Sequence, residues 1–139
     1  MTIKEQQDSI IEEFSFFTDW TEKYEHIIQM GKDLPLIDAK YKTEENLIKG
    51  CQSRVWLHAD YKDGKIFFTA DSDAVITKGL ISMVVRVLSG HSPKDIAESQ
   101  IYFIDEIGLK SHLSITRSNG LLSMLKQMKL YGVALQAKG

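Results

Sequence analysis

Cys51 is the only cysteine of the chain and the side chain best suited to covalent chemistry. The thiolate is the nucleophilic form of cysteine, and a nearby cation such as Arg54 favours it over the thiol. Gly50 precedes the thiol, and the polar residues Gln52 and Ser53 follow it. Connecting segments of this kind often carry function. The residues alone make Cys51 a candidate reactive thiol, with a buried, inert cysteine as the commoner alternative.

Other kinds of chemistry lack the residues that they need. A zinc or iron-sulfur site requires several soft ligands at workable spacing. The chain has one cysteine, and its four histidines show no paired spacing. It also has neither of the glycine-rich loops that bind dinucleotides or nucleoside phosphates. We therefore expect no metal site and no cofactor bound by this chain.

The composition is that of an ordinary globular protein. The chain has 139 residues, of which 43% are hydrophobic and 26% charged, so we expect one domain over residues 1–139. No apolar run approaches the ~20 residues that a membrane-spanning helix needs, and the first residues do not resemble a secretory signal. A single cysteine fits a reducing compartment. These features predict a cytoplasmic protein with no membrane partner.

The charges are unevenly distributed along the chain. Residues 109–139 carry five Lys or Arg residues and no acid, whereas residues 1–50 carry 6 basic against 11 acidic residues, a net charge of -5. A basic segment can indicate nucleic-acid binding. Here the five cations are sparse, and no nucleic-acid-binding motif accompanies them. We interpret them as the solvated face of a helix and expect no nucleic-acid partner.

The periodicity of the hydrophobic residues predicts the elements that must position Cys51. It indicates amphipathic helices over residues 3–17 and 20–31, then an ordered loop over 36–50. Two strands, 55–61 and 66–70, flank an Asp-Gly turn, and residues 71–73 offer N-caps for the next helix, which ends at Gly90. A short helix after Ser92, a helical turn at 101–107 and a last helix over about 117–137 complete the chain. The predicted fold class is α+β, a small antiparallel sheet flanked by helices.

Four stretches of the sequence, in the right order, resemble the SufE family. The most specific is the cysteine motif, Gly50 to Leu57, read as GCQSRVWL. The other three are residues 20–35 (WTEKY, then II, G and LP), residues 71–80 (DSDA, then KGL) and residues 117–121 (RSNGL). Asn119 is a mild departure, because glutamine is common there in the family. The resemblance spans nearly the whole chain.

The resemblance implies a role in iron-sulfur cluster assembly. SufE-like proteins accept sulfur from a cysteine desulfurase, stimulate that enzyme and pass the sulfur to a cluster scaffold. The expected partners are a SufS-like desulfurase, which holds the pyridoxal phosphate itself, and a scaffold complex. The family fold is similar to that of the scaffold proteins, but a chain with one cysteine should carry sulfur without building a cluster. The chain is expected to be a monomer or weak homodimer and an activator protein, not an enzyme in its own right.

The resemblance also assigns roles to individual residues. Cys51 is the persulfide acceptor, and Gly50 gives its segment mobility; we expect the thiol to pack inward in the free protein and to move outward on docking. Gln52 and Ser53 are candidate hydrogen-bond donors to the sulfur. Asp73 is either a turn or cap residue or a contact that steers docking or the exposed loop.

Arg117 has three interpretations: a brace of the fold, a cation that complements the thiolate, or a side chain that reaches the active site of the partner. Trp56 is expected to belong to the core.

Two other functions remain as alternatives. Cys51 could be the nucleophile of a cysteine-dependent hydrolase with His58 or His112 as the base, although no motif indicates an oxyanion hole. The chain could also be a non-catalytic adaptor with a structural Cys51 and an acidic docking surface in its N-terminal half.

Overall fold

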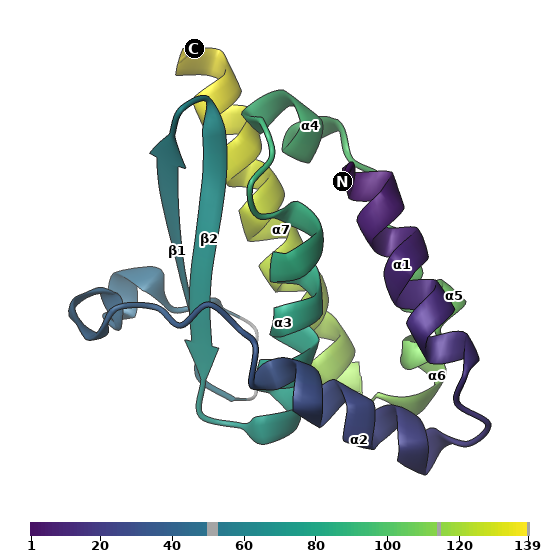
Figure 1. Ribbon diagram of the computed structural model, residues 1–139. Helices are drawn as coiled ribbons and strands as arrows, with labels where there is room; N and C mark the ends of the chain where they lie inside the picture. Colours follow the sequence, from purple (N-terminus) through teal and green to yellow (C-terminus); the bar gives the residue numbers. More distant parts are fainter. Residues whose placement is uncertain (50–52, 114, 139) are drawn as a thin grey trace.

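The structure is a computed structural model that describes residues 1–49, 53–113 and 115–138. It contains one antiparallel hairpin and a set of helices that lie beside and below it (Figure 1). The strands are β1 (Val55–Lys62) and β2 (Lys65–Ser72). The α-helices are α1 (Ile3–Ser15), α2 (Trp20–Gly31), α3 (Val75–Leu88), α4 (Pro93–Glu98), α5 (Phe103–Glu106), α6 (Leu109–His112) and α7 (Ile115–Lys138). Two 3-10 helices, η1 (Ala39–Tyr41) and η2 (Glu44–Asn46), precede the hairpin.

The Asp-Gly turn sets the register of the hairpin. Asp63 and Gly64 have φ values of 54° and 76°, and positive φ at both central residues gives the tight turn whose twist suits two antiparallel strands. Lys62 therefore pairs with Lys65, and the pairing continues to Val55 opposite Ser72. Alternate residues of the strands are buried, beginning with Val55, Leu57, Ile66 and Phe68. The hairpin thus has one face toward the helices and one face away from them.

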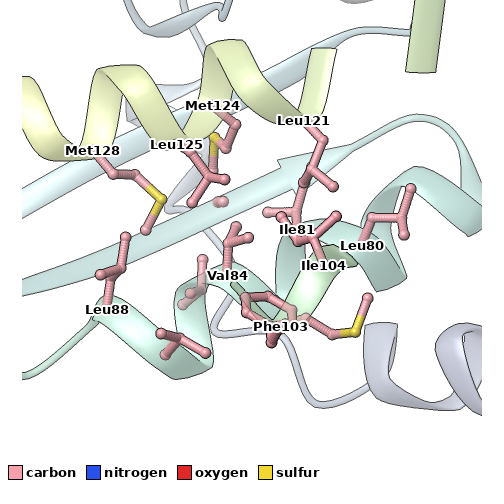
Figure 2. Packing of buried hydrophobic residues seen from close by; sticks show 14 of the residues in the cluster. Leu80, Ile81, Val84, Leu88, Phe103, Ile104, Leu121, Met124, Leu125 and Met128 are labelled. Carbon is pink, nitrogen blue, oxygen red and sulfur yellow. The ribbon is translucent and has the colours of Figure 1, made fainter. Parts of the chain in front are cut away.

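The hydrophobic core is formed mainly by α3 and α7. Figure 2 shows Leu121, Met124, Leu125 and Met128 of α7 pointing toward the side chains of α3, with Phe103 and Ile104 packed against them. Almost every side chain from Gly79 to Leu88 is buried. The sequence predicted α3 as a helix with one buried stripe, but the helix is covered on several sides because α1, α2, α7 and β2 all contact it.

Helices α2 and α3 approach each other at two glycines. A Cβ atom added to Gly79 would lie 2.1 Å from the carbonyl oxygen of Ile27, and one added to Gly31 would lie 3.0 Å from the amide nitrogen of Gly79. Real Cβ atoms do not approach backbone atoms as closely as 2.1 Å, so the separation of the two helices requires glycine at position 79. Ser82 reinforces the contact, since its hydroxyl donates to the carbonyl oxygen of Met30 at 2.7 Å.

Side chains cap α2 and α4, whereas the predicted cap of α3 is wrong. The amide of Glu22 donates to the carboxylate of Asp19, and the amide of Asp95 donates to the hydroxyl of Ser92. The segment 71–73 does not cap α3 in the predicted way. The N-cap of α3 is Ala74, with no side-chain cap bond, because β2 continues to Ser72 and the Asp73 carboxylate accepts a hydrogen bond from the amide of Arg54, just before β1.

The predicted loop before the hairpin is an arm, residues 35–49, that crosses the strands (Figure 1). It begins on the outer edge of β2, where Ile37 donates to the carbonyl of Ala70 and the amide of Ala70 donates to Pro35, both at 3.1 Å. It ends on the outer edge of β1, where Leu47 forms an antiparallel bridge with Trp56. The arm therefore runs from one edge of the sheet to the other.

Within the described residues, no helix combines the length and the apolar character needed to cross a bilayer.

Substitution of Gly79 with alanine is expected to destabilise the protein by about 1–3 kcal/mol, because α2 and α3 must separate to make room for a methyl group. Urea unfolding followed by circular dichroism measures the change. Thr77→Ala, two residues earlier in the same helix, is the control and should change the free energy of unfolding by no more than about 0.5 kcal/mol. Equal stability of the Gly79→Ala and wild-type proteins would contradict this close packing.

Candidate functional site: the cysteine connection

Residues 49–54, which we term the cysteine connection, join the arm to β1. Gly50, Cys51 and Gln52 lie outside the described residues, so the structure tests neither their predicted roles nor the inward packing of the thiol. The two ends of the connection are described. Ile48 donates its amide hydrogen to the carbonyl of Val55 at 2.8 Å, and the adjoining residues Leu47 and Trp56 form an antiparallel bridge. In the sequence, Cys51 therefore stands between two segments that pair with each other.

Asp73 holds the C-terminal end of the cysteine connection. Its carboxylate accepts a hydrogen bond from the amide of Arg54 at 3.1 Å, and its own amide donates to the carbonyl of Arg54 at 3.3 Å. The pair continues the ladder of β1 and β2 by one step. Asp73 was predicted as a turn or cap residue or as a contact that steers docking or the exposed loop; in the structure it bonds to the backbone of Arg54, which follows Cys51 by three residues in the sequence.

Of the other predicted site residues, Ser53 is described and Arg117 only in part. Ser53 is partly buried immediately before Arg54. Arg117 lies in the first turn of α7, but its side chain is outside the description. The structure therefore leaves the three interpretations of Arg117 open.

A cleft of about 450 Å³ lies beside the N-terminal end of the cysteine connection. Its walls are residues 45–49 of the arm, Leu57 of β1 and the α7 residues Ser123, Gln127, Leu130 and Tyr131. Lys49 and Lys126 line the same cleft and give it positive charge next to Glu45. The space between the arm and α7 is thus open on the side where Cys51 is attached.

The two histidines considered as general bases both have other contacts. The ring of His58 stacks on Tyr41, with ring centroids 3.7 Å apart, and its Nε2 lies 3.0 Å from the Asp60 carboxylate. The ring of His112 stacks on Trp20, with centroids 3.9 Å apart. These contacts give both side chains structural roles and lend no support to a Cys–His pair.

The described residues hold no group of three or more His, Cys, Asp or Glu side chains placed to bind a metal ion. Trp56, expected in the core, is only partly buried. It lies on the face of β1 that the arm crosses, and the ammonium of Lys42 sits 4.9 Å from the centre of its ring.

The sequence profile of the SufE family, described as an Fe-S metabolism associated domain, matches residues 8–131. The chain belongs to the SufE family. It is 39% identical over 127 residues to a SufE-like protein of Rhizobium meliloti, covering 88% of this chain and 91% of that protein. A SufE-like protein of Synechocystis is 35% identical over 127 residues, covering 91% of this chain and 80% of that protein. These matches confirm the family that the four sequence stretches indicated.

Two further matches extend the comparison. A SufE-like protein of Arabidopsis thaliana, named as chloroplastic and mitochondrial, is 41% identical over 118 residues, covering 84% of this chain and 32% of the plant protein. A solution structure of a protein from Thermus thermophilus superposes with a TM-score of 0.78 at 19% identity, covering 95% of this chain and 96% of that one. The structural match confirms the α+β fold class.

Sequence reasoning missed two features of this site. The first is the backbone pairing of Asp73 with Arg54. The two-residue turn at 63–64 sets a register that places these residues opposite each other, one step beyond the ends of the strands. The second is the course of the arm over the sheet. No periodicity in residues 35–49 indicates it, because the arm is held by backbone bonds at its two ends and by isolated side chains between them.

Asp73→Ala is expected to remove the acceptor of the Arg54 amide and to cost about 1 kcal/mol of stability, as for a partly exposed hydrogen bond. Hydrogen exchange measured by NMR should show faster exchange of the Arg54 amide and of its neighbours at the start of β1. Asp73→Asn keeps an oxygen in place to accept the bond and should retain most of the protection. Equal exchange in the alanine variant and the wild type would mean that the bond does not hold this end of the connection.

Proposed function

We propose that the protein accepts sulfur from a cysteine desulfurase onto Cys51, stimulates that enzyme and passes the sulfur to an iron-sulfur cluster scaffold. The observation that carries the proposal is the SufE-family match over residues 8–131, combined with a single cysteine in the most family-specific stretch of the sequence. In this proposal the chain is an activator and carrier that works in the same compartment as its desulfurase, and the pyridoxal phosphate belongs to the partner.

The chemistry requires only one sulfur nucleophile. The thiolate of Cys51 attacks the outer sulfur of a persulfide on the desulfurase, a new S–S bond forms, and the cysteine of the desulfurase leaves as a thiolate, as in thiol–disulfide exchange. The outer sulfur and its proton move together to Cys51, so no external oxidant or reductant is needed. A second cysteine would discharge the product by forming a disulfide, and the chain has none.

The geometry around the cysteine connection is consistent with transfer between two proteins. Both ends of the connection are held by backbone bonds, to Val55 on one side and to Asp73 on the other. Only the short stretch 49–53 separates the two bonded residues, Ile48 and Arg54, and it carries the thiol that has to reach a partner. The cleft between the arm and α7 leaves the adjacent surface accessible to a partner.

Incubation with L-cysteine and the desulfurase of the same genome, without reductant, is expected to add one or more sulfur atoms to the protein. Intact-protein mass spectrometry measures the addition, and Cys51→Ser is the control that should gain none. The desulfurase must turn over in the same sample. An unchanged mass beside an active desulfurase would refute sulfur acceptance. Stimulation of the desulfurase that persists in Cys51→Ser would instead favour the adaptor alternative.

A further inference from the structure

The outer edge of β2 is closed by backbone and side-chain bonds along its length. Its outward backbone groups are bonded at Ile66, Phe68 and Ala70. The partners are residues 89–91, which follow α3, and residues 35–37 at the start of the arm, at distances from 2.7 to 3.1 Å. No further strand can therefore pair with β2.

The outer edge of β1, the strand on the left of Figure 1, is covered only at its start. There the carbonyl of Val55 accepts the amide hydrogen of Ile48. Outward groups recur at every second residue of an antiparallel strand, so those of Ala59 and Tyr61 point the same way as those of Val55. Among the residues that the structure describes, none forms a backbone hydrogen bond with Ala59 or Tyr61 on this side. The strand thus presents two N–H groups and two carbonyls that a further strand could pair with.

Apolar side chains accompany this open edge. Tyr61 is 48% exposed, as is Leu130 of α7. Leu130 lies in the wall of the 450 Å³ cleft together with Leu57, the outward residue that precedes Ala59 in β1. An unpaired strand edge binds an extended peptide through backbone bonds, and nearby pockets select its alternate side chains. The edge and the cleft together have the features of such a site.

The cleft joins the open edge to the cysteine connection. Lys49, the first residue of the connection, lines the cleft with Lys126. In the proposed function the desulfurase is the protein that has to approach this connection, and a segment of it seated in the cleft would contact β1 at the same time. Two lysines against one acid, Glu45, favour a segment that carries a carboxylate.

A second copy of this chain fits the edge poorly. Antiparallel pairing about Ala59 would place Lys62 of the copy opposite Trp56, where Leu47 of the arm already lies. Pairing about Asp60 would set the two Asp60 side chains directly opposite each other, and like charges in that position are destabilising. The edge is therefore better suited to a different protein than to self-association.

We propose that β1 binds an extended segment of the partner desulfurase along residues 59–61, as an added strand of the sheet. The segment has apolar side chains at alternate positions, toward Tyr61 and Leu130, and a carboxylate that meets Lys49 and Lys126 in the cleft. The proposal deepens the sulfur-acceptor function and rests on it for the identity of the partner. Backbone bonds supply the affinity, and the cleft selects the segment.

The test measures amide hydrogen exchange in the whole protein, alone and with an excess of the pyridoxal-phosphate-loaded desulfurase of the same genome, without L-cysteine. Exchange is quenched and read residue by residue by NMR. The amides of Ala59 and Tyr61 are expected to exchange roughly ten-fold more slowly in the complex, as for one added hydrogen bond. The amides of His58 and Asp60 point toward β2 and should be protected in both samples, which makes them internal controls.

A proline variant tests the same bonds by affinity. Ala59→Pro removes the outward N–H and leaves the bonds of the hairpin in place, because an edge strand tolerates proline where its N–H faces solvent. The dissociation constant for the desulfurase, measured by isothermal titration calorimetry, is expected to rise about ten-fold. Ala59→Ser keeps the N–H and should bind as the wild type does.

Charge reversal tests the cleft. Lys126→Glu is expected to raise the dissociation constant roughly five-fold at low salt, and less at high salt, because salt screens exposed charges. Lys94→Glu changes an exposed lysine in the first turn of α4. It alters the net charge by the same amount and should leave the dissociation constant unchanged.

Unchanged exchange at Ala59 and Tyr61 with excess desulfurase would overturn the proposal, as would wild-type affinity of Ala59→Pro. Sulfur transfer in the same samples would then leave the proposed function intact. Protection of the two amides that grows with protein concentration, without the desulfurase, would assign the edge to a second copy and also overturn the proposal. Equal weakening by Lys126→Glu and Lys94→Glu would contradict the role of the cleft.

Failure of the wild type to gain sulfur from an active desulfurase is a different result. It would refute the proposed function, whereas the exchange of Ala59 and Tyr61 would still show whether the desulfurase pairs with this edge.

Discussion

Helix α3 is the element on which the other parts of the structure depend, because nearly all of it from Gly79 to Leu88 is buried. A two-stranded hairpin is marginal on its own in water, and here its buried face rests on this helix. The close contact at Gly79 brings α2 against one side of α3, and α7 covers another (Figure 2). The direction in which α2 ends then fixes where the arm begins, at the edge of β2. The position of the paired segments on either side of the cysteine connection therefore follows from helix packing.

Backbone pairing, more than side-chain packing, defines the candidate site. The cysteine connection lies between two ladders: the bridge of the arm to β1 at Trp56, and the extension of the hairpin to Arg54 and Asp73. Hydrogen bonds between backbone groups can form with many different side chains, so this pairing places little restriction on the residue types of the connection. The residues around the thiol are thus free to serve reactivity and partner recognition, as is common where a loop is carried by a rigid frame.

The helices, the hairpin and the family were predictable from the sequence, because each leaves a local or periodic signal. Asp63-Gly64 marks the turn, Asp19 and Ser92 mark helix starts, and the stretch GCQSRVWL marks the family. The candidate site was harder to predict from the sequence. Asp73 looks like a helix cap in the sequence, and only the register of the hairpin shows that it faces Arg54 instead. The arm gives no periodic signal, because it is held by the separate contacts of Lys42 and Tyr41, whose partners lie 29 and 17 residues away in the sequence.

The spacing of Asp71 and Asp73 explains how the end of β2 contacts two separate segments, the arm and the residue before β1. In a strand, residues two apart point to the same face and lie about 6.6–6.8 Å apart along the chain. Asp71 and Asp73 are therefore directed to the outward side of the sheet, the first beside Trp56 and the second beside Arg54. Each contact is polar and partly exposed, and such contacts contribute on the order of 1 kcal/mol. Together they tie the arm and the residue before β1 to the end of one strand, so both segments that flank the cysteine connection depend on the same short stretch of chain.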